Sequence, residues 1–566
     1  MNPEVTPGIA LAAATPLLAW LAYRRLSLSL AKYPSLAGHA RMSRRLSRLV
    51  PYYEIAEARF FDVDGATPEV ADRRRAGFAQ LAQLYATRFA RSVAMTRESF
   101  DGIADLDFTS RYRVPYPFSR VVREKLPSGA FLASATGLTV TDLDGNTFYD
   151  LTGSYGVNVL GNDTYKACIE RAVARARDLG PVLGPYHPIL ADNVRRLREL
   201  SGLDSVSFHM SGTEAVMQAV RLARYHTRRA RIVRFCGAYN GWWDDVQPGV
   251  GNPIAPRETL TLREMHPATL RVLRQRRDIA CVLVNPLQAL HPNASAPSDS
   301  ALVDSSRAAR RDRAAYAAWL RELREVCTAS GIVLVFDEVF VGFRLARGGA
   351  QEYFGVRADL VTYGKTLGGG LPVGVLCGRR DLMQRYREDR PADICFARGT
   401  FNSHPYVMAA MHEFLELLDD PSMHAAYAGL DARWESRAAR CNERLQAAQV
   451  PVRIENLSSI WTVLYTRPAR YNWMLQYYLR AQGLALPWIG TGRLIFPIDC
   501  ADQDFEAVAE RFAAAATAMD RDGWWSGPEI SNRKIRRQVL REMLPHLWRP
   551  PIGSINSPRS RRNGAL

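Results

Sequence analysis

Short apolar runs alternate with helical patterns through the middle of the chain. Six runs rich in β-branched residues are separated by segments whose apolar residues recur at helical spacing. Runs that are apolar along their whole length are typical of parallel strands covered on both faces. The pattern therefore predicts an α/β large domain over residues 163–420, with a mostly parallel sheet and helices on both faces. The six expected strands are residues 206–209, 231–235, 279–284, 332–336, 360–363 and 373–377.

Strand patterns also occur on either side of this region. A hairpin is expected at residues 137–150, where alternating apolar residues surround an Asp-Gly turn at 144–145. Residues 451–512 return to mixed strand and helix patterns. We therefore expect a smaller α+β domain made from two distant pieces of the chain, residues 108–162 and 421–525.

The outer parts of the chain follow other patterns. Residues 26–107 are rich in arginine and alanine and predict a helical extension, which a Pro-x-Pro run at 115–117 ends. The tail, residues 526–566, is basic; we expect a helix over 534–548 and a disordered polar end. Residues 293–306 are rich in Ser, Ala, Asp and Pro and predict a surface loop.

The N-terminal segment, residues 1–25, contains an apolar stretch over 8–23 that Arg24 and Arg25 follow. The stretch has no basic region before it and no small-residue cleavage site, so it does not match a cleaved signal peptide. It is shorter than the ~20 residues of a full membrane span, and it contains Pro16. Two alternatives stand: an anchor or interfacial helix on the cytoplasmic side of a membrane, or a helix packed on the main domain.

Charge and cysteine usage narrow the class of protein. The formal net charge is +17 and is carried mainly by arginine, which favours anionic membrane surfaces or acidic substrates. No zinc-finger spacing or RNA-recognition signature is present, so nucleic acid is not an expected partner. The eight cysteines are scattered without a C-x-x-C pair. They predict reduced thiols in a cytoplasmic protein, with neither a disulfide framework nor a metal site.

Lys365 is the first candidate for chemistry. It is the only lysine between Lys166 and Lys534, and it lies just after the expected strand 360–363 and before a run of glycines. A residue in that position lies at the carboxyl edge of a parallel sheet, where ligands bind in open α/β folds. Partial burial can keep such an amine uncharged, as Schiff-base chemistry requires.

Two further positions fit a Schiff-base enzyme. Asp337 ends the apolar run 332–336, and a carboxylate there stays ionised only when paired, for which a pyridinium N–H is suitable. Residues 211–213, Ser-Gly-Thr, pass from a strand into a helix. That turn offers free N–H groups and the helix dipole to a phosphate. With Glu214 it also forms a Ser-x-x-Glu capping pattern, and the two uses are compatible.

Together these motifs resemble the class III, fold-type I pyridoxal-phosphate (PLP) aminotransferases, and within that family look most like the glutamate-1-semialdehyde 2,1-aminomutases. The resemblance covers about residues 115–525. It implies a PLP-transferase large domain, a smaller α+β domain, PLP as cofactor and a homodimer. The matching motifs are SGTEAVM at 211–217, FDEV at 336–339, GFR at 342–344, GGAQ at 348–351, YGKTLGGGLPVG at 363–374 and GTFNSHP at 399–405.

The resemblance also implies a catalytic pair and the residues around the cofactor ring. Lys365 would bind PLP as a Schiff base and then move the substrate proton, while Asp337 would pair with the pyridine nitrogen. Val339 and Tyr239 would pack on opposite faces of the ring.

The remaining implied contacts concern the phosphate and the substrate. The phosphate would be held by Ser211, Gly212 and Thr213. Thr400 is similar to the threonine that reaches the phosphate from the neighbouring subunit. Arg120 and Tyr155 match positions on the substrate side.

Some positions depart from the family pattern. Asn240 stands where the family often has histidine, Asn285 stands where it often has glutamate, and the loop after Trp243 is short. These departures are expected to spare the cofactor site and to fall on the substrate side. The first interpretation is an aminotransferase that moves an amino group from a donor to a carbonyl acceptor in a specialised pathway. The alternatives are an aminomutase, which moves the group within one molecule, and a non-catalytic scaffold.

Overall fold

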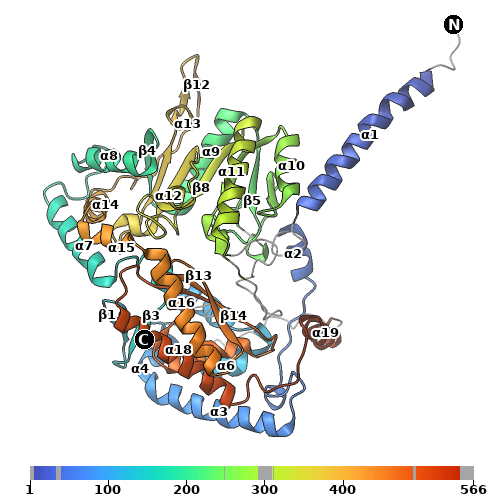
Figure 1. Ribbon diagram of the computed structural model, residues 1–566, viewed down its shortest axis with the longest axis vertical. Coiled ribbons are helices and arrows are strands. Elements are labelled where there is room, and N and C mark those ends of the chain that lie inside the picture. Colours follow the sequence, from blue (N-terminus) through green and yellow to red (C-terminus); the bar gives the residue numbers. More distant parts are fainter. Residues whose placement is uncertain are drawn as a thin grey trace, which may run out of the picture.

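A seven-stranded sheet forms the centre of the large domain (Figure 1). The computed structural model describes residues 6–32, 40–247, 249–290, 309, 311–487 and 492–547. The strand order is β4-β10-β9-β8-β7-β5-β6, and only β10 runs antiparallel to its neighbours. The strands are β4 (Ser205–His209), β5 (Arg231–Phe235), β6 (Thr259–Leu262), β7 (Ile279–Val284), β8 (Val333–Asp337), β9 (Leu360–Gly364) and β10 (Gly374–Gly378).

The predicted fold class is confirmed. All six expected strands form within one residue of the expected bounds, and the sheet is mostly parallel. The strand that the hydrophobic pattern missed is β6, at the edge of the sheet beside β5.

Helices cover both faces of this sheet, as expected from its fully apolar strands (Figure 1). In β8, Val333 and Val335 pack in one core cluster with the helix α9 (Gly212–Thr227). Leu334 and Phe336 point the other way, into the main cluster that includes α11 (Arg313–Ser330). The other helices of this domain are α7 (Asn162–Ala176), α8 (Ile189–Ser201), α10 (Pro267–Gln275), α12 (Gly349–Phe354), α13 (Arg380–Met383) and α14 (Pro405–Leu418).

Two small sheets make up the second domain. One has the order β1-β2-β3-β15 and the other β13-β14-β16. The expected hairpin is confirmed as β2 and β3, with Gly145 at φ 82° in its turn. The two distant chain pieces meet where β3 pairs in parallel with β15. The elements are β1 (Leu132–Thr136), β2 (Thr139–Asp142), β3 (Thr147–Asp150), β13 (Val452–Leu457), β14 (Ile460–Tyr465), β15 (Leu484–Ala485), β16 (Arg493–Ile495), α15 (Pro421–Tyr427), α16 (Leu430–Ala447), α17 (Leu475–Ala481) and α18 (Asp502–Arg521), and a separate hairpin joins β11 (Tyr386–Arg387) to β12 (Arg390–Ile394).

The N-terminal extension is helical, as predicted, and packs against the small domain. Arg74 anchors it: the fully buried guanidinium pairs with Asp64 and donates to the carbonyl oxygens of Phe61 and Gly523. The ring of Tyr471 lies 4.7 Å from that guanidinium. Its helices are α2 (Ala40–Ser47), α3 (Pro68–Arg88), α4 (Ala90–Glu98) and α5 (Ala104–Tyr112), and α6 (Ser119–Lys125) follows the Pro-x-Pro run.

The apolar N-terminal stretch lies within a helix, α1 (Thr6–Ala31), that projects from the body (Figure 1). In the described residues, no helix has the length and apolar character needed to cross a membrane. In the basic tail, α19 (Asn532–Met543) forms where a helix was expected. The expected loop at 293–306 and the polar end of the tail lie outside the described residues.

Candidate active site

Lys365 directly follows the last residue of β9 and has a left-handed backbone conformation, with φ 49°. Burial lowers the pKa of its amine; Asp337 opposes that effect, and Arg344 adds to it. The Nζ atom lies 5.4 Å from the centroid of the Phe340 ring. An amine with a lowered pKa has a larger uncharged fraction near neutral pH, so it can act as a nucleophile.

Asp337 ends β8 and is 5% exposed. Asn240 Nδ2 donates to its Oδ2 at 2.8 Å, and the Val339 N–H and the Thr362 hydroxyl donate to its Oδ1 at 3.3 Å. Burial raises the pKa of the carboxyl, whereas these donors and the charge of Lys365 lower it. Hydrogen bonds to the ionised form therefore oppose the cost of burying this charge.

The N-terminus of α9 supplies a site for an anion. The Ser211 hydroxyl accepts from the Glu214 N–H at 3.2 Å, while the Glu214 carboxylate accepts from the Met210 N–H at 2.9 Å. The predicted capping arrangement therefore forms. The N–H groups of Gly212 and Thr213 lie in the first helical turn, where no carbonyl of the helix can accept from them. They remain available to an anion, together with the positive end of the helix dipole.

Gly212 allows α9 to approach the segment after β8. A Cβ atom at this position would lie 2.6 Å from Cγ1 of Val339, closer than packed carbons can come. Glycine is therefore needed here to keep the start of α9 next to Val339 and Asp337.

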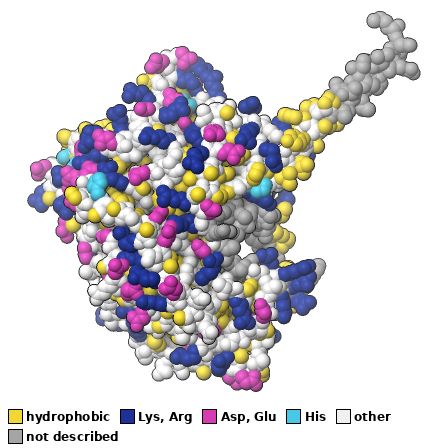
Figure 2. All heavy atoms as spheres, viewed as in Figure 1, with side chains coloured by type: hydrophobic (Ala, Val, Ile, Leu, Met, Phe, Trp, Pro, Cys, Tyr) yellow, Lys and Arg dark blue, Asp and Glu magenta, His cyan; other side chains and the backbone are white. Residues whose placement is uncertain are grey.

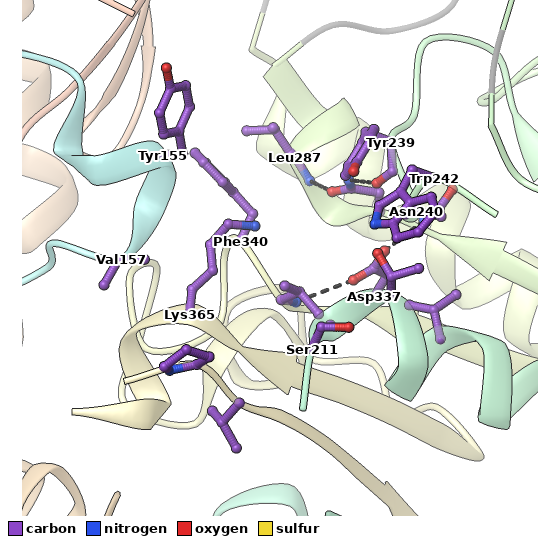
Figure 3. Close-up of a pocket in the computed structure, with 18 of the residues that line it drawn as sticks. Tyr155, Val157, Ser211, Tyr239, Asn240, Trp242, Leu287, Asp337, Phe340 and Lys365 are labelled. Carbon is purple, nitrogen blue, oxygen red and sulfur yellow. Dashed lines mark hydrogen bonds between the residues drawn. The ribbon is translucent and has the colours of Figure 1, made fainter. Parts of the chain in front are cut away.

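These groups face one cavity of about 940 Å³ (Figure 3). Figure 3 shows Lys365 and Tyr155 on one side of the space and Asp337, Tyr239 and Asn240 on the other. The structure brings together eight of the ten predicted site residues in the cavity wall: Tyr155, Ser211, Gly212, Thr213, Tyr239, Asp337, Val339 and Lys365.

Two predicted site residues do not line the cavity of this chain. Arg120 instead donates from Nε to Glu54 at 2.8 Å and lies near Glu124, so its charge is already paired. Thr400 is exposed, in the segment before α14.

Asn240 differs from its expected place. It was assigned to the substrate side, but its fully buried side chain donates to Asp337, the residue implied to contact the cofactor. That assignment is wrong because the stacking motif and the end of β8 meet only in the folded sheet. Asn285 donates to the backbone carbonyl of Tyr239 at 2.9 Å and thus holds the chain beside that ring.

Sequence reasoning also missed Arg493, a cavity residue from β16 of the small domain. Its Nε is buried and has no hydrogen-bond partner among the described residues. Because the chain has many arginines, composition does not distinguish Arg493 as a site residue. Only the fold places it opposite the large-domain side of the cavity. The apolar wall residues Trp242, Leu287 and Phe340 were missed for the same reason.

The set of donors and acceptors fits a phosphorylated pyridine aldehyde. Such a group needs an amine to bond to its aldehyde, a carboxylate for its ring nitrogen and N–H groups for its phosphate. Lys365, Asp337 and the start of α9 supply these three in one cavity.

Sequence comparisons agree with this geometry. The family Aminotransferase class-III matches residues 121–515. Glutamate-1-semialdehyde 2,1-aminomutase from Nitratidesulfovibrio vulgaris strain DP4 is 35% identical over 340 residues, covering 59% of this chain and 77% of that protein. The enzyme of the same name from Geotalea daltonii is 31% identical over 398 residues, covering 66% and 86%.

Solved structures show the same fold. An omega-transaminase from Sphaerobacter thermophilus is 26% identical, with a TM-score of 0.58 over 74% of this chain and 98% of that chain. A β-phenylalanine aminotransferase from Variovorax paradoxus is 25% identical, with a TM-score of 0.60 over 78% and 97%. A glutamate-1-semialdehyde aminomutase from Pseudomonas aeruginosa PAO1, at 17% identity and a TM-score of 0.61 over 79% and 99%, shares the fold. The chain therefore belongs to the class III aminotransferases, and it is an enzyme whose cofactor is pyridoxal 5′-phosphate.

Proposed function

We propose that this enzyme transfers an amino group from a donor to a separate carbonyl acceptor in two half-reactions. The observation that carries the proposal is the shared cavity, in which the Lys365 amine, the Asp337 carboxylate and the start of α9 face one another. Bound PLP supplies an electron sink for the negative charge that develops on the substrate α-carbon.

In this proposal each group has a separate task. Lys365 Nζ holds the resting cofactor and later carries the proton that leaves the substrate α-carbon. Asp337, kept ionised by Asn240, binds the ring N–H. Val339 and Tyr239 confine the ring from opposite sides, and Ser211, Gly212 and Thr213 bind the phosphate, with Tyr155 beside the substrate.

We further propose that the substrates carry a carboxylate and an apolar portion. Apart from Lys365, Arg493 is the only cationic side chain among the described residues that line the cavity, and its Nε lacks a partner. Phe340, Leu287 and Trp242 add apolar side chains to the cavity lining. An Arg493→Met variant should raise KM for carboxylate donors about ten- to 150-fold, which corresponds to the loss of one charge-assisted hydrogen bond of ~1.5–3 kcal/mol. An unchanged KM would assign carboxylate binding elsewhere.

The cofactor and the half-reaction are tested by one absorption experiment. The wild type, reconstituted with PLP, should show a visible band that Lys365→Ala lacks and that an amino donor bleaches. A carbonyl acceptor should then restore the band. Absence of the band after incubation with PLP would refute the catalytic assignment and favour the non-catalytic scaffold.

An aminomutase is the second candidate, because the curated relatives at 31–35% identity carry that name. The two functions differ in their need for a second substrate. A mutase turns over one amino aldehyde to completion without any acceptor, whereas a transaminase stops after one cofactor equivalent until acceptor is added. Sustained turnover of glutamate 1-semialdehyde alone would favour the mutase.

We propose that the active form is a homodimer in which Thr400 reaches the partner's phosphate site. Large apolar side chains near the cavity and near Thr400 are exposed in the single chain, including Trp242 and Phe401. Mixing Lys365→Ala with Thr400→Glu tests this directly. If Thr400 acts across the interface, a hybrid keeps one intact site, and random pairing restores about a quarter of wild-type activity. If it acts within its own chain, no activity returns.

We also propose a cytoplasmic location, supported by eight free and buried cysteines.

The division of the chain proposed from the sequence, at residues 25, 107, 162, 420 and 525, is compatible with the sheets. All strands of the large sheet lie within 163–420, and both small-domain sheets draw on its flanks. Limited proteolysis should cut first near residues 162, 420 and 525, because residues 25 and 107 lie inside α1 and α5.

A further inference from the structure

α1 leaves apolar side chains in solvent along its projecting part (Figure 2). Its base is held to the body: Ala31 O accepts from the Arg263 N–H at 2.8 Å, and Tyr23 Oη accepts from Gln275 at 3.2 Å. Toward the N-terminus, no such contact is seen among the described side chains. The exposed large residues are Leu17, Leu18, Trp20, Leu21, Tyr23, Leu26 and Leu30, from 42% to 64% exposed.

These side chains surround the helix rather than form one stripe. At 100° per residue, Leu18 and Trp20 lie on nearly opposite sides, and Leu26 lies between them. Helices that are apolar all round are normally buried on all sides, in a large core or in lipid. Because the body covers only the C-terminal end of the described part of α1, the exposed apolar side chains from Leu17 to Leu30 need another apolar environment to cover them.

The charges on and just after α2 indicate which kind of apolar environment covers α1. Met42 and Leu46 of α2 and Leu49 in the turn after it form an exposed apolar stripe at helical spacing. Each of these apolar residues directly follows an arginine: Arg41, Arg45 and Arg48. All three arginines are exposed and have no ion-pair partner among the described residues. The whole stretch from residue 5 to residue 53 contains seven Lys and Arg residues and no acidic residue.

α19 repeats the arrangement at the other end of the chain. Its exposed Leu540 shares one side with Arg533 and Arg537, and the exposed Leu544 and Leu547 follow in and just after the short helical turn Leu544–His546. The buried Ile535 lies on the opposite side and attaches the helix to the body. Basic residues interleaved with leucines on an exposed helix are typical of binding to anionic lipid surfaces.

The three helices lie along one edge of the molecule (Figure 1). The Tyr53 ring, shortly after α2, stacks on His546 at 5.6 Å and joins this segment to the end of α19. Figure 2 shows a cluster of dark blue side chains where α19 lies and yellow ones along α1. We propose that α1, α2 and α19 form one surface that binds anionic phospholipid membranes. The apolar side chains of α1 enter the acyl region, and the arginines of α2 and α19 bind lipid phosphates.

The test is co-sedimentation of the full-length holoenzyme with vesicles. The wild type should pellet with vesicles of phosphatidylcholine and phosphatidylglycerol in equal parts and stay in solution with phosphatidylcholine alone. Replacing Arg41, Arg45 and Arg48 by Gln should lower the partition coefficient on the order of a hundredfold. The matched control replaces three exposed arginines on other elements, and it should bind like the wild type: Arg97→Gln, Arg177→Gln and Arg198→Gln.

A second variant tests the apolar part without disturbing the core. Trp20→Glu with Leu21→Glu changes only exposed positions, so the absorption spectrum should persist while vesicle binding is lost. Equal binding to both kinds of vesicle, or equal losses in the two arginine triples, would overturn the proposal. A third outcome would also overturn it: the wild type does not bind vesicles but forms a larger oligomer, and the Trp20/Leu21 variant does not form that oligomer. The exposed side chains of α1 would then be covered by a second copy of the chain.

Discussion

Asn240 offers the sharpest probe of how this site keeps a buried acid ionised. Its side chain is fully buried, and its Nδ2 donates to Asp337 Oδ2 at 2.8 Å. An Asn240→Ala variant removes that donor and leaves a carboxylate whose pKa burial already raises. A hydrogen bond to a charged group contributes ~1.5–3 kcal/mol, so the Kd for PLP should rise about ten- to 150-fold.

The direction in which PLP affinity changes with pH follows from the pKa of Asp337. The bond from Asn240 favours the ionised carboxyl and lowers the pKa of Asp337, so its loss raises that pKa further. As pH falls, the variant therefore protonates Asp337 earlier than the wild type and loses the partner of the ring N–H earlier. Titration of the apo-enzyme with PLP, followed by absorption at several pH values, measures both effects.

A buried asparagine elsewhere provides the control. Asn193 is equally buried and donates to the Met408 carbonyl at 2.8 Å, outside the set of cavity-lining residues. Asn193→Ala should lower the free energy of unfolding without changing the Kd for PLP. If Asn240→Ala shows the same affinity as the wild type at every pH, then Asn240 does not hold the charge of Asp337 and the reasoning is wrong.

Three further substitutions test other parts of the fold. Arg74→Met leaves Asp64 buried without its partner. The free energy of unfolding, measured in urea, should therefore fall by about 3–5 kcal/mol, while the Kd for PLP stays unchanged. A loss below 1 kcal/mol, on the order of an exposed ion pair, would contradict this expectation. Burial raises the pKa of Glu264 from 4.5 to about 8, so wild-type stability should decline as pH rises between those values, and Glu264→Gln should flatten that decline in urea unfolding. Gly212→Ala forces its new methyl group against Val339, so PLP affinity should drop at least tenfold, about 1.4 kcal/mol, and the free energy of unfolding should fall by about 1–3 kcal/mol; unchanged affinity would show that α9 can shift at no cost.

The large sheet was predictable because its strands are apolar along their whole length. β7 and β8 are buried at every position, so any pattern search finds them. β6 reads Thr-Leu-Thr-Leu at the sheet edge and is only partly buried, so its short alternating pattern is not distinct from that of a loop. The lysine and the acid of the site were predictable for a related reason: Asp337 is the last residue of the apolar strand β8, and Lys365 directly follows the apolar strand β9.

Contacts made between elements were not predictable. Nothing near Asn240 in the sequence indicates Asp337, because the two meet only when the folded sheet brings the loop after β5 beside the carboxyl end of β8, with β7 between these two strands. Arg74 lies in a helix crowded with arginines, and burial, not composition, distinguishes it from the others. Arg493 enters the cavity wall from a strand of only three residues, too short to give a pattern.

The pairing of β3 with β15 has a consequence for synthesis of the protein. Tyr149 of β3 lies opposite Leu484 of β15, so this pair forms only after most of the chain has left the ribosome. All strands of the large sheet lie between them in the sequence, so that sheet can form first, during translation. Long-range pairings of this kind form slowly. The wall that carries Arg493 therefore closes late, and a chain truncated before residue 484 would retain Lys365 and Asp337 in a half-open site that faces solvent.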